Sequence, residues 1–177
     1  MSEFDLVIRG GKIATAADVF AADIGIRGGQ IAAIGERLAK GVREIDARNR
    51  LVMPGGIDSH CHIEQRTSTG LMSADDFYSG TVSAMCGGTT TIVPFACQHR
   101  GMSVREVVKQ YHDAAGPKAV IDYAFHLIVS DPSEQVVGQE LPALIKDGYT
   151  SFKVYLTYDA LKVSDGDTVE AEYLDVL

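Results

Sequence analysis

The sequence predicts an α/β chain, in which a small β-sandwich segment over residues 1–53 precedes the first half of a (β/α)8 barrel of the TIM type over residues 54–177. Two observations support this prediction. Short apolar segments separated by glycine pairs fill the first part, whereas strands and capped helices alternate after residue 51. A complete eight-unit barrel needs roughly 250 residues, so we expect the chain to be truncated.

Glycine pairs separate the strands of the first segment. We expect a turn at Gly10-Gly11 and a hairpin turn at Gly28-Gly29, because two glycines between alternating apolar and polar residues are typical of a β-hairpin. The predicted strands are residues 4–8, 12–14, 22–27, 30–34 and 43–47.

The barrel part begins with one long predicted strand over residues 51–62. Ser73 is the predicted N-cap of the first helix, which ends at Gly87-Gly88. Ser103 caps the second helix, and Pro142 divides the third. The remaining predicted strands are residues 89–97, 120–130 and 150–156, and a fourth helix begins near Asp167. Strands that alternate with helices in this way form a parallel sheet.

Composition excludes several classes of protein. A net charge of -8 argues against nucleic-acid binding, which needs clustered Lys and Arg. No apolar run reaches the roughly 18 residues of a transmembrane helix, and the acidic start lacks the basic region of a signal peptide. Three cysteines at no disulfide-like spacing are typical of a reducing compartment. We therefore expect a cytoplasmic protein without nucleic-acid or membrane partners.

Two histidines end the first barrel strand, in the motif Asp58-Ser59-His60-Cys61-His62. Alternate side chains of a strand point the same way, so Asp58, His60 and His62 share one face. Neutral imidazoles suit zinc and related ions, and active sites of barrels lie at this end of the strands. We predict that His60 and His62 bind metal, the alternative being two half-exposed loop histidines. Asp58 either orients a ligand or caps a turn.

Lys153 occupies an inward position of the strand at residues 150–156, whose alternate positions are apolar. Burial lowers the pKa of a lysine and yields a nucleophilic amine, although the side chain could instead extend to the rim. Tyr158, in the following loop, either donates to a developing oxyanion or packs on a neighbour. We expect His126 to be a hydrogen-bonded core residue and His112 to be solvated.

Together these motifs resemble the cyclic amidohydrolases, above all their dihydropyrimidinase and hydantoinase branch. The resemblance implies a CO2-derived carbamate on Lys153 that bridges two divalent metals, usually zinc. It implies that His60 and His62 bind the more buried ion and that Tyr158 polarises the substrate carbonyl. The resemblance is carried, in the family's order, by residues 5–11, 54–62, 87–91 and 151–158.

The implied activity is hydrolysis of the cyclic amide bond of dihydropyrimidines (dihydrouracil, dihydrothymine), as in pyrimidine degradation, or of 5-substituted hydantoins. A hydroxide that bridges the metals is the implied nucleophile, and a homotetramer is the implied assembly. Two histidines and a catalytic aspartate of the family come from later strands, outside these 177 residues. The loop at residues 65–72 would shape the pocket for the ring substituent.

Two alternatives remain. An allantoinase or dihydroorotase-like amidohydrolase shares the metal site, although Tyr158 disfavours it. A non-enzymatic dihydropyrimidinase-like scaffold protein keeps the fold without the metal site, and the intact His60, His62 and Lys153 weigh against it.

Overall fold

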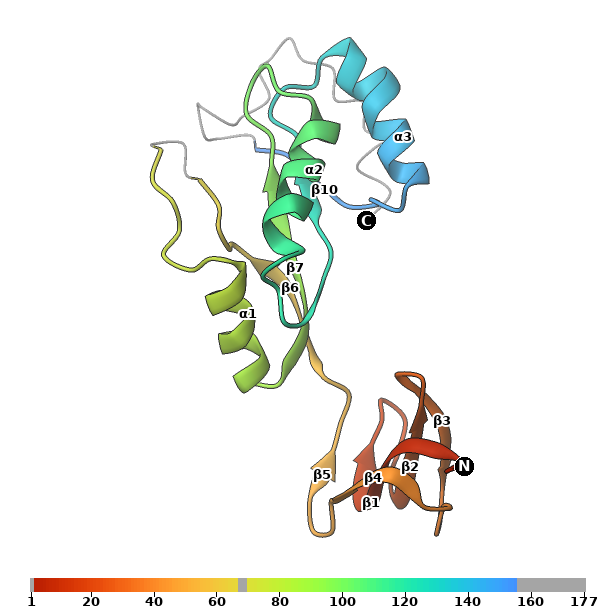
Figure 1. The fold of residues 1–177 in the computed structure, drawn as a ribbon. Helices are drawn as coiled ribbons and strands as arrows, with labels where there is room; N and C mark the ends of the chain where they lie inside the picture. The colour runs from red at the N-terminus through yellow and green to blue at the C-terminus, as the bar shows by residue number, and fades with distance from the viewer. Residues whose placement is uncertain (1, 67–69, 156–177) are drawn as a thin grey trace. The chain divides into compact units, whose positions relative to one another are not determined.

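The computed structural model describes residues 2–66 and 70–155, and the chain divides into two compact units, Met1–Pro54 and Gly55–Leu177 (Figure 1). The first unit contains strands only, and the second alternates strands with helices. In the described ranges, the longest helix is too short and too polar to span a membrane.

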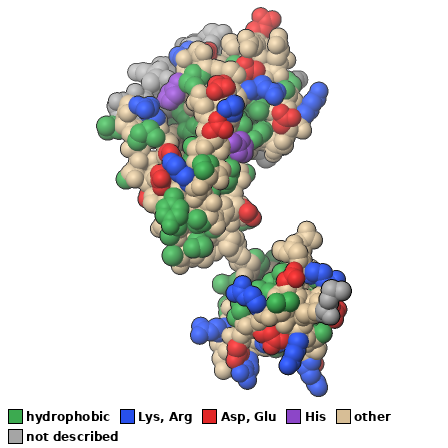
Figure 2. Space-filling view, viewed as in Figure 1, with side chains coloured by type: hydrophobic (Ala, Val, Ile, Leu, Met, Phe, Trp, Pro, Cys, Tyr) green, Lys and Arg blue, Asp and Glu red, His purple; other side chains and the backbone are tan. Residues whose placement is uncertain are grey.

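The first unit is a five-stranded mixed sheet in the order β3-β2-β1-β4, with β5 also beside β1. β1 pairs antiparallel with β2 and parallel with β4 and β5. Acidic and basic side chains are interspersed with apolar ones over its visible face (Figure 2). The strands are β1 (Phe4–Ala14), β2 (Val19–Arg27), β3 (Gln30–Gly35), β4 (Gly41–Asp46) and β5 (Leu51–Val52).

The two glycine pairs of this unit have different roles. Gly28 and Gly29 have φ values of 58° and 77°, and they form the predicted hairpin turn between β2 and β3. The turn predicted at Gly10-Gly11 is wrong, because β1 continues through it. The register with β2 shifts between Ile8 and Gly11, and Gly10 has a φ of 63°. These glycines therefore form a β-bulge, in which positive φ is supplied by glycine at little cost.

The long strand predicted over residues 51–62 is also wrong. It is two strands, β5 in the first unit and β6 (Gly56–Cys61) in the second. Pro54 has no amide to donate to a strand ladder. Gly55 lies so close to the strand β7 (Thr89–Cys97) that a Cβ there would sit 2.0 Å from the Thr90 hydroxyl oxygen. Pro54 and Gly55 therefore interrupt the strand, and the chain passes from the sheet of the first unit to the sheet of the second.

The second unit is built on parallel strands in the order β6-β7-β9-β10, with β8 also beside β7. The strand predicted at residues 120–130 is two short strands that both pair with β7. The strands are β6, β7 (Thr89–Cys97), β8 (Asp122–Tyr123), β9 (His126–Ile128) and β10 (Phe152–Lys153).

The helices are α1 (Phe77–Cys86), α2 (Val104–Ala115) and α3 (Leu141–Lys146), which follows the π-helical turn η1 (Val136–Glu140). Ser103 caps α2 as predicted, and Pro142 lies in the first turn of α3, where the third helix is divided. The N-cap of α1 is Asp76, not Ser73. Asp76 accepts from Ser79, which completes a capping box that Ser73 cannot form from its position in the loop.

Two apolar clusters cover opposite faces of the parallel sheet. The larger joins the sheet to the helices through residues such as Phe77, Ile92 and Leu127. Its border contains His112, whose Nε2 lies 2.6 Å from the Tyr149 hydroxyl, so the prediction of a solvated His112 is wrong. The smaller cluster, on the other face, consists of Phe95, Cys97 and Ile128 with Tyr155.

A buried carboxylate in the first unit accepts hydrogen bonds from β1 and from the segment after β3. Asp23 is 8% exposed and accepts from Arg9 Nη1 at 2.8 Å, from the Gly10 amide at 2.8 Å and from the Leu38 amide at 3.2 Å. Burial alone would raise the pKa of Asp23, but these hydrogen bonds outweigh it and lower that pKa.

We expect Asp23→Ala to lower the free energy of unfolding by about 2 kcal/mol, because it leaves a cation and two amides without their acceptor. Asp46→Ala, at an exposed pair with Arg48, should have a much smaller effect.

Because the folded pKa of Asp23 is lowered, the contribution of this carboxylate to the free energy of unfolding is complete above about pH 4 and disappears as the pH falls through that folded pKa. Urea unfolding of wild type and Asp23→Asn between pH 7 and pH 2 tests this, and a difference independent of pH would contradict it.

Candidate metal centre

His60 and His62 lie at the carboxyl end of β6, beside β7. Their ring centroids are 5.6 Å apart, and the two rings pack against Phe95 at 4.8 Å and 5.0 Å. Cys61, between them, packs against the core that faces the helices. The alternation predicted for the two histidines is therefore confirmed.

Lys153, in β10, extends toward the same aromatic ring. Its side-chain nitrogen lies 4.2 Å from the centroid of Phe95 and 4.9 Å from that of Tyr155. Its neighbours Phe152 and Val154 pack on the opposite face, against the helix-side core. The predicted inward orientation of Lys153 is thus confirmed. Within the described part of the chain, none of the ion pairs involves it.

The two imidazoles fit one divalent ion. A zinc–nitrogen bond of about 2.0–2.1 Å places the ring centres of two histidines on one tetrahedral ion about 5 Å apart, close to the separation of His60 and His62. Cys61 does not add a ligand, because its side chain packs against the helix-side core, away from the two imidazoles. Among the described residues, no three His, Cys, Asp or Glu side chains gather closely enough to hold an ion. The side-chain nitrogen of Lys153 contacts the same Phe95 ring as the two imidazoles.

A hydrogen bond favours one tautomer of His62. Its Nδ1 lies 2.5 Å from Oε1 of Gln65, and an amide oxygen can only accept. In the neutral imidazole this contact favours the tautomer with the proton on Nδ1, which leaves the lone pair of Nε2 available to a metal. This is the usual arrangement of a metal-binding histidine, in which a partner on one ring nitrogen orients the other.

His126 connects the strands that carry these residues. Its Nε2 donates to the carbonyl oxygen of Ser59 in β6 at 2.9 Å, and its Nδ1 accepts from the hydroxyl of Ser151, just before β10. Its ring packs against Phe95 at 5.1 Å. The half-buried His126 is hydrogen-bonded at both nitrogens, as predicted, and neither is left for a metal.

Two predicted site residues remain, Asp58 and Tyr158, and the structure describes only Asp58. The carboxylate of Asp58 accepts from the backbone amide of His60 at 3.0 Å. Asp58 thus caps the backbone at the strand end, the second of the two predicted roles. Tyr158 lies outside the described residues, as does the predicted fourth helix.

Phe95 was not among the predicted site residues, and Gln65 was predicted only as part of the pocket loop at residues 65–72. A signal existed for Phe95, because the neighbouring Pro94 and Ala96 suit a buried, helix-facing side of the strand, which leaves Phe95 on the inward face. Nothing local distinguishes Gln65, whose role depends on a turn that brings it back to His62.

Known proteins are similar to this chain in both sequence and fold. The model of the amidohydrolase family matches residues 51–153. A D-hydantoinase of Rhizobium radiobacter is 47% identical over 165 residues, which cover 93% of this chain and 36% of that protein. A dihydropyrimidinase of Rattus norvegicus is 37% identical over 88% of this chain and 31% of its own length.

Solved structures extend the comparison. A D-hydantoinase structure matches with a TM-score of 0.85 and 43% identity, over 98% of this chain and 36% of that one. The chain thus spans about a third of the length of such relatives. Its second unit is the first part of a (β/α)8 barrel. The chain belongs to the amidohydrolase family, where it is similar to the hydantoinases and dihydropyrimidinases.

Proposed function

We propose that this chain is part of a metal-dependent hydrolase that opens the ring of dihydropyrimidines or 5-substituted hydantoins. The observation that carries the proposal is the convergence of His60, His62 and Lys153 on the ring of Phe95. The similarity to enzymes named D-hydantoinase and dihydropyrimidinase supports these substrates over those of an allantoinase or dihydroorotase.

In this proposal the site holds two divalent metals, of which zinc suits the histidine ligands best. His60 and His62 would hold one ion, and a carbamate on Lys153 would supply oxygen ligands. The metals, when bound, lower the pKa of water and polarise the amide carbonyl.

The family resemblance implies the carbamate, and the inward position of Lys153 beside Phe95 supports it. The ammonium would first lose one proton to water. The lone pair of the resulting neutral amine would form a bond to the carbon of CO2 as one C=O π pair moves onto oxygen, and a second N–H proton would leave to water. With two protons released, a cation on the inward face would become an anion with oxygen ligands, which a pair of metals would stabilise. Without this step the ammonium interacts with the faces of Phe95 and Tyr155.

Other residues of the chain orient and shield the site. Gln65 accepts a hydrogen bond from Nδ1 of His62, which leaves Nε2 to bind the ion. The buried ring of Phe95 lies against one side of both histidines and limits the directions that their rings can take. We assign to Tyr158 the donation of its hydroxyl proton to the carbonyl oxygen as negative charge develops there.

A reducing cytoplasm suits this protein, because Cys61, Cys86 and Cys97 are all free in the part of the chain that the structure describes. A homotetramer is proposed from the family resemblance alone.

In the full-length protein that carries this chain, Lys153→Ala should remove bound metal and lower ring opening of hydantoin and dihydrouracil. We expect a loss greater than the about 10–100-fold typical of outer-shell substitutions, because a direct ligand is removed. Metal analysis and initial rates measure this, with Lys146→Ala, exposed at the end of α3, as control. A Lys153→Ala variant with both metals and full activity would rule out the carbamate role.

Tyr158→Phe in the same protein should lower kcat by about 100–1000-fold, because one donor to the developing oxyanion is lost. Metal content should stay unchanged, which separates this role from ligand binding. Tyr78→Phe, at an exposed position of α1, is the matched control. An unaltered kcat would leave Tyr158 with a packing role only.

A further inference from the structure

The chain turns sharply just after His62. Glu64 has a φ of 48°, in the left-handed region that residues with a side chain rarely adopt. Its amide donates to the carbonyl oxygen of Asp75 at 2.9 Å. A residue keeps such a conformation only where its surroundings hold it there.

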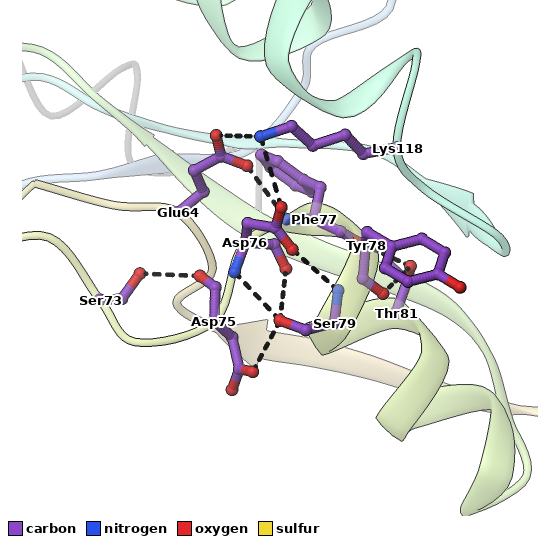
Figure 3. A network of polar contacts seen from close by, with 9 residues as sticks. All are labelled: Glu64, Ser73, Asp75, Asp76, Phe77, Tyr78, Ser79, Thr81 and Lys118. Atoms are coloured by element: carbon purple, nitrogen blue, oxygen red, sulfur yellow. Dashed lines mark hydrogen bonds and ion pairs between the residues drawn. The ribbon is translucent and has the colours of Figure 1, made fainter.

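The carboxylate of Glu64 holds the turn through two other elements (Figure 3). Its Oε2 accepts from the amide of Phe77 at 3.0 Å, which satisfies a free donor in the first turn of α1. Its Oε1 lies 2.5 Å from Nζ of Lys118, just after α2. Lys118 also lies 3.5 Å from Oδ2 of Asp76, the N-cap of α1. One carboxylate thus ties the turn to the start of one helix and the end of another.

This ion pair differs from the surface pairs of the molecule. The side chains of Glu64 and Lys118 are 21% and 35% exposed, whereas those of Lys109 and Asp113 on α2 are 66% and 64% exposed. Partly buried charges are screened less by solvent than exposed ones. The Glu64–Lys118 pair can therefore hold a strained turn, and the exposed pair offers a control with the same charges.

The turn also carries the partner of His62. Gln65, the next residue, exchanges hydrogen bonds of 3.0 Å with Ser73, through its own amide and carbonyl groups. Its side-chain oxygen reaches Nδ1 of His62. Because Glu64 lies between His62 and Gln65, the geometry of the turn decides whether the Gln65 amide meets the imidazole.

We propose that Glu64, held by Lys118, is a positioning residue for His62. It fixes the turn through which Gln65 sets the tautomer and the direction of the imidazole. The proposal rests on the proposed function in one respect, namely that Nε2 of His62 binds a metal. The tautomer itself can be measured without metal.

The first test is the state of His62 in the metal-free, full-length protein. NMR of 15N-labelled histidine distinguishes a protonated Nδ1 from a protonated Nε2, and His62→Gln assigns the signal. Glu64→Gln keeps an acceptor for the Phe77 amide but loses the charge, and Lys118→Met removes the cation. We expect the Nδ1-protonated form to dominate in the wild type and to lose population in both variants. A His62 signal that is unchanged in both would overturn the proposal.

The second test is zinc affinity, measured by competition with a chelator. We expect Glu64→Gln and Lys118→Met each to weaken binding about tenfold, the lower end of outer-shell effects. The double variant should lose little more than either single one, because the two residues act as a pair. Lys109→Met and Asp113→Asn remove matched charges of an exposed pair on α2 and should leave affinity unchanged.

The outcomes separate the two proposals. Variants of Glu64 and Lys118 that unfold at lower temperature but keep the affinity and the His62 signal of the wild type would show a purely structural pair. A wild type that takes up no zinc, but whose His62 responds to both substitutions, would support the positioning role and contradict the metal site.

Discussion

The parallel register of β7 and its neighbours decides where every group of the candidate metal centre lies. Phe95 in β7 pairs with His126 in β9, and Ile128 in β9 pairs with Lys153 in β10. Parallel strands end at one edge of their sheet, so groups that are distant in sequence meet there. A shift of one residue in this register would turn Lys153 toward the helices and separate it from the histidines of β6.

Besides the strand register, hydrogen bonds of side chains also position the two histidines. His126 links the backbone of β6 to the segment that enters β10. On the other side of His62, the turn at Glu64 is tied to α1 and to Lys118. The histidine pair is therefore supported from the sheet and from the helix layer. Such support holds the donor atoms in place before any metal arrives, which lowers the cost of ordering them on binding.

The order of strands and helices, the inward orientation of Lys153 and the shared contact of the two histidines were predictable, because they follow from alternation along a strand. The single strand at residues 51–62 and the N-cap at Ser73 were mispredicted. The strand is broken where Gly55 approaches the distant Thr90, whereas the N-cap moves to Asp76 because Asp76 and Ser79 form a local capping box that competes with Ser73. The supporting contacts of Gln65 and Glu64 have no sequence signal, since they depend on where a strained turn places them.

The alternation of side chains at the ends of β6 and β10 has a consequence for how this protein can change over evolution. Cys61 and Val154 face the helix-side core, and His62 and Lys153 face the opposite side. Adjacent codons thus carry separate selective pressures, one on packing and one on chemistry. Variation at the outward positions can adjust stability while the inward groups stay the same. Variation in the inward set changes the groups of the candidate metal centre, so packing and site chemistry can vary separately.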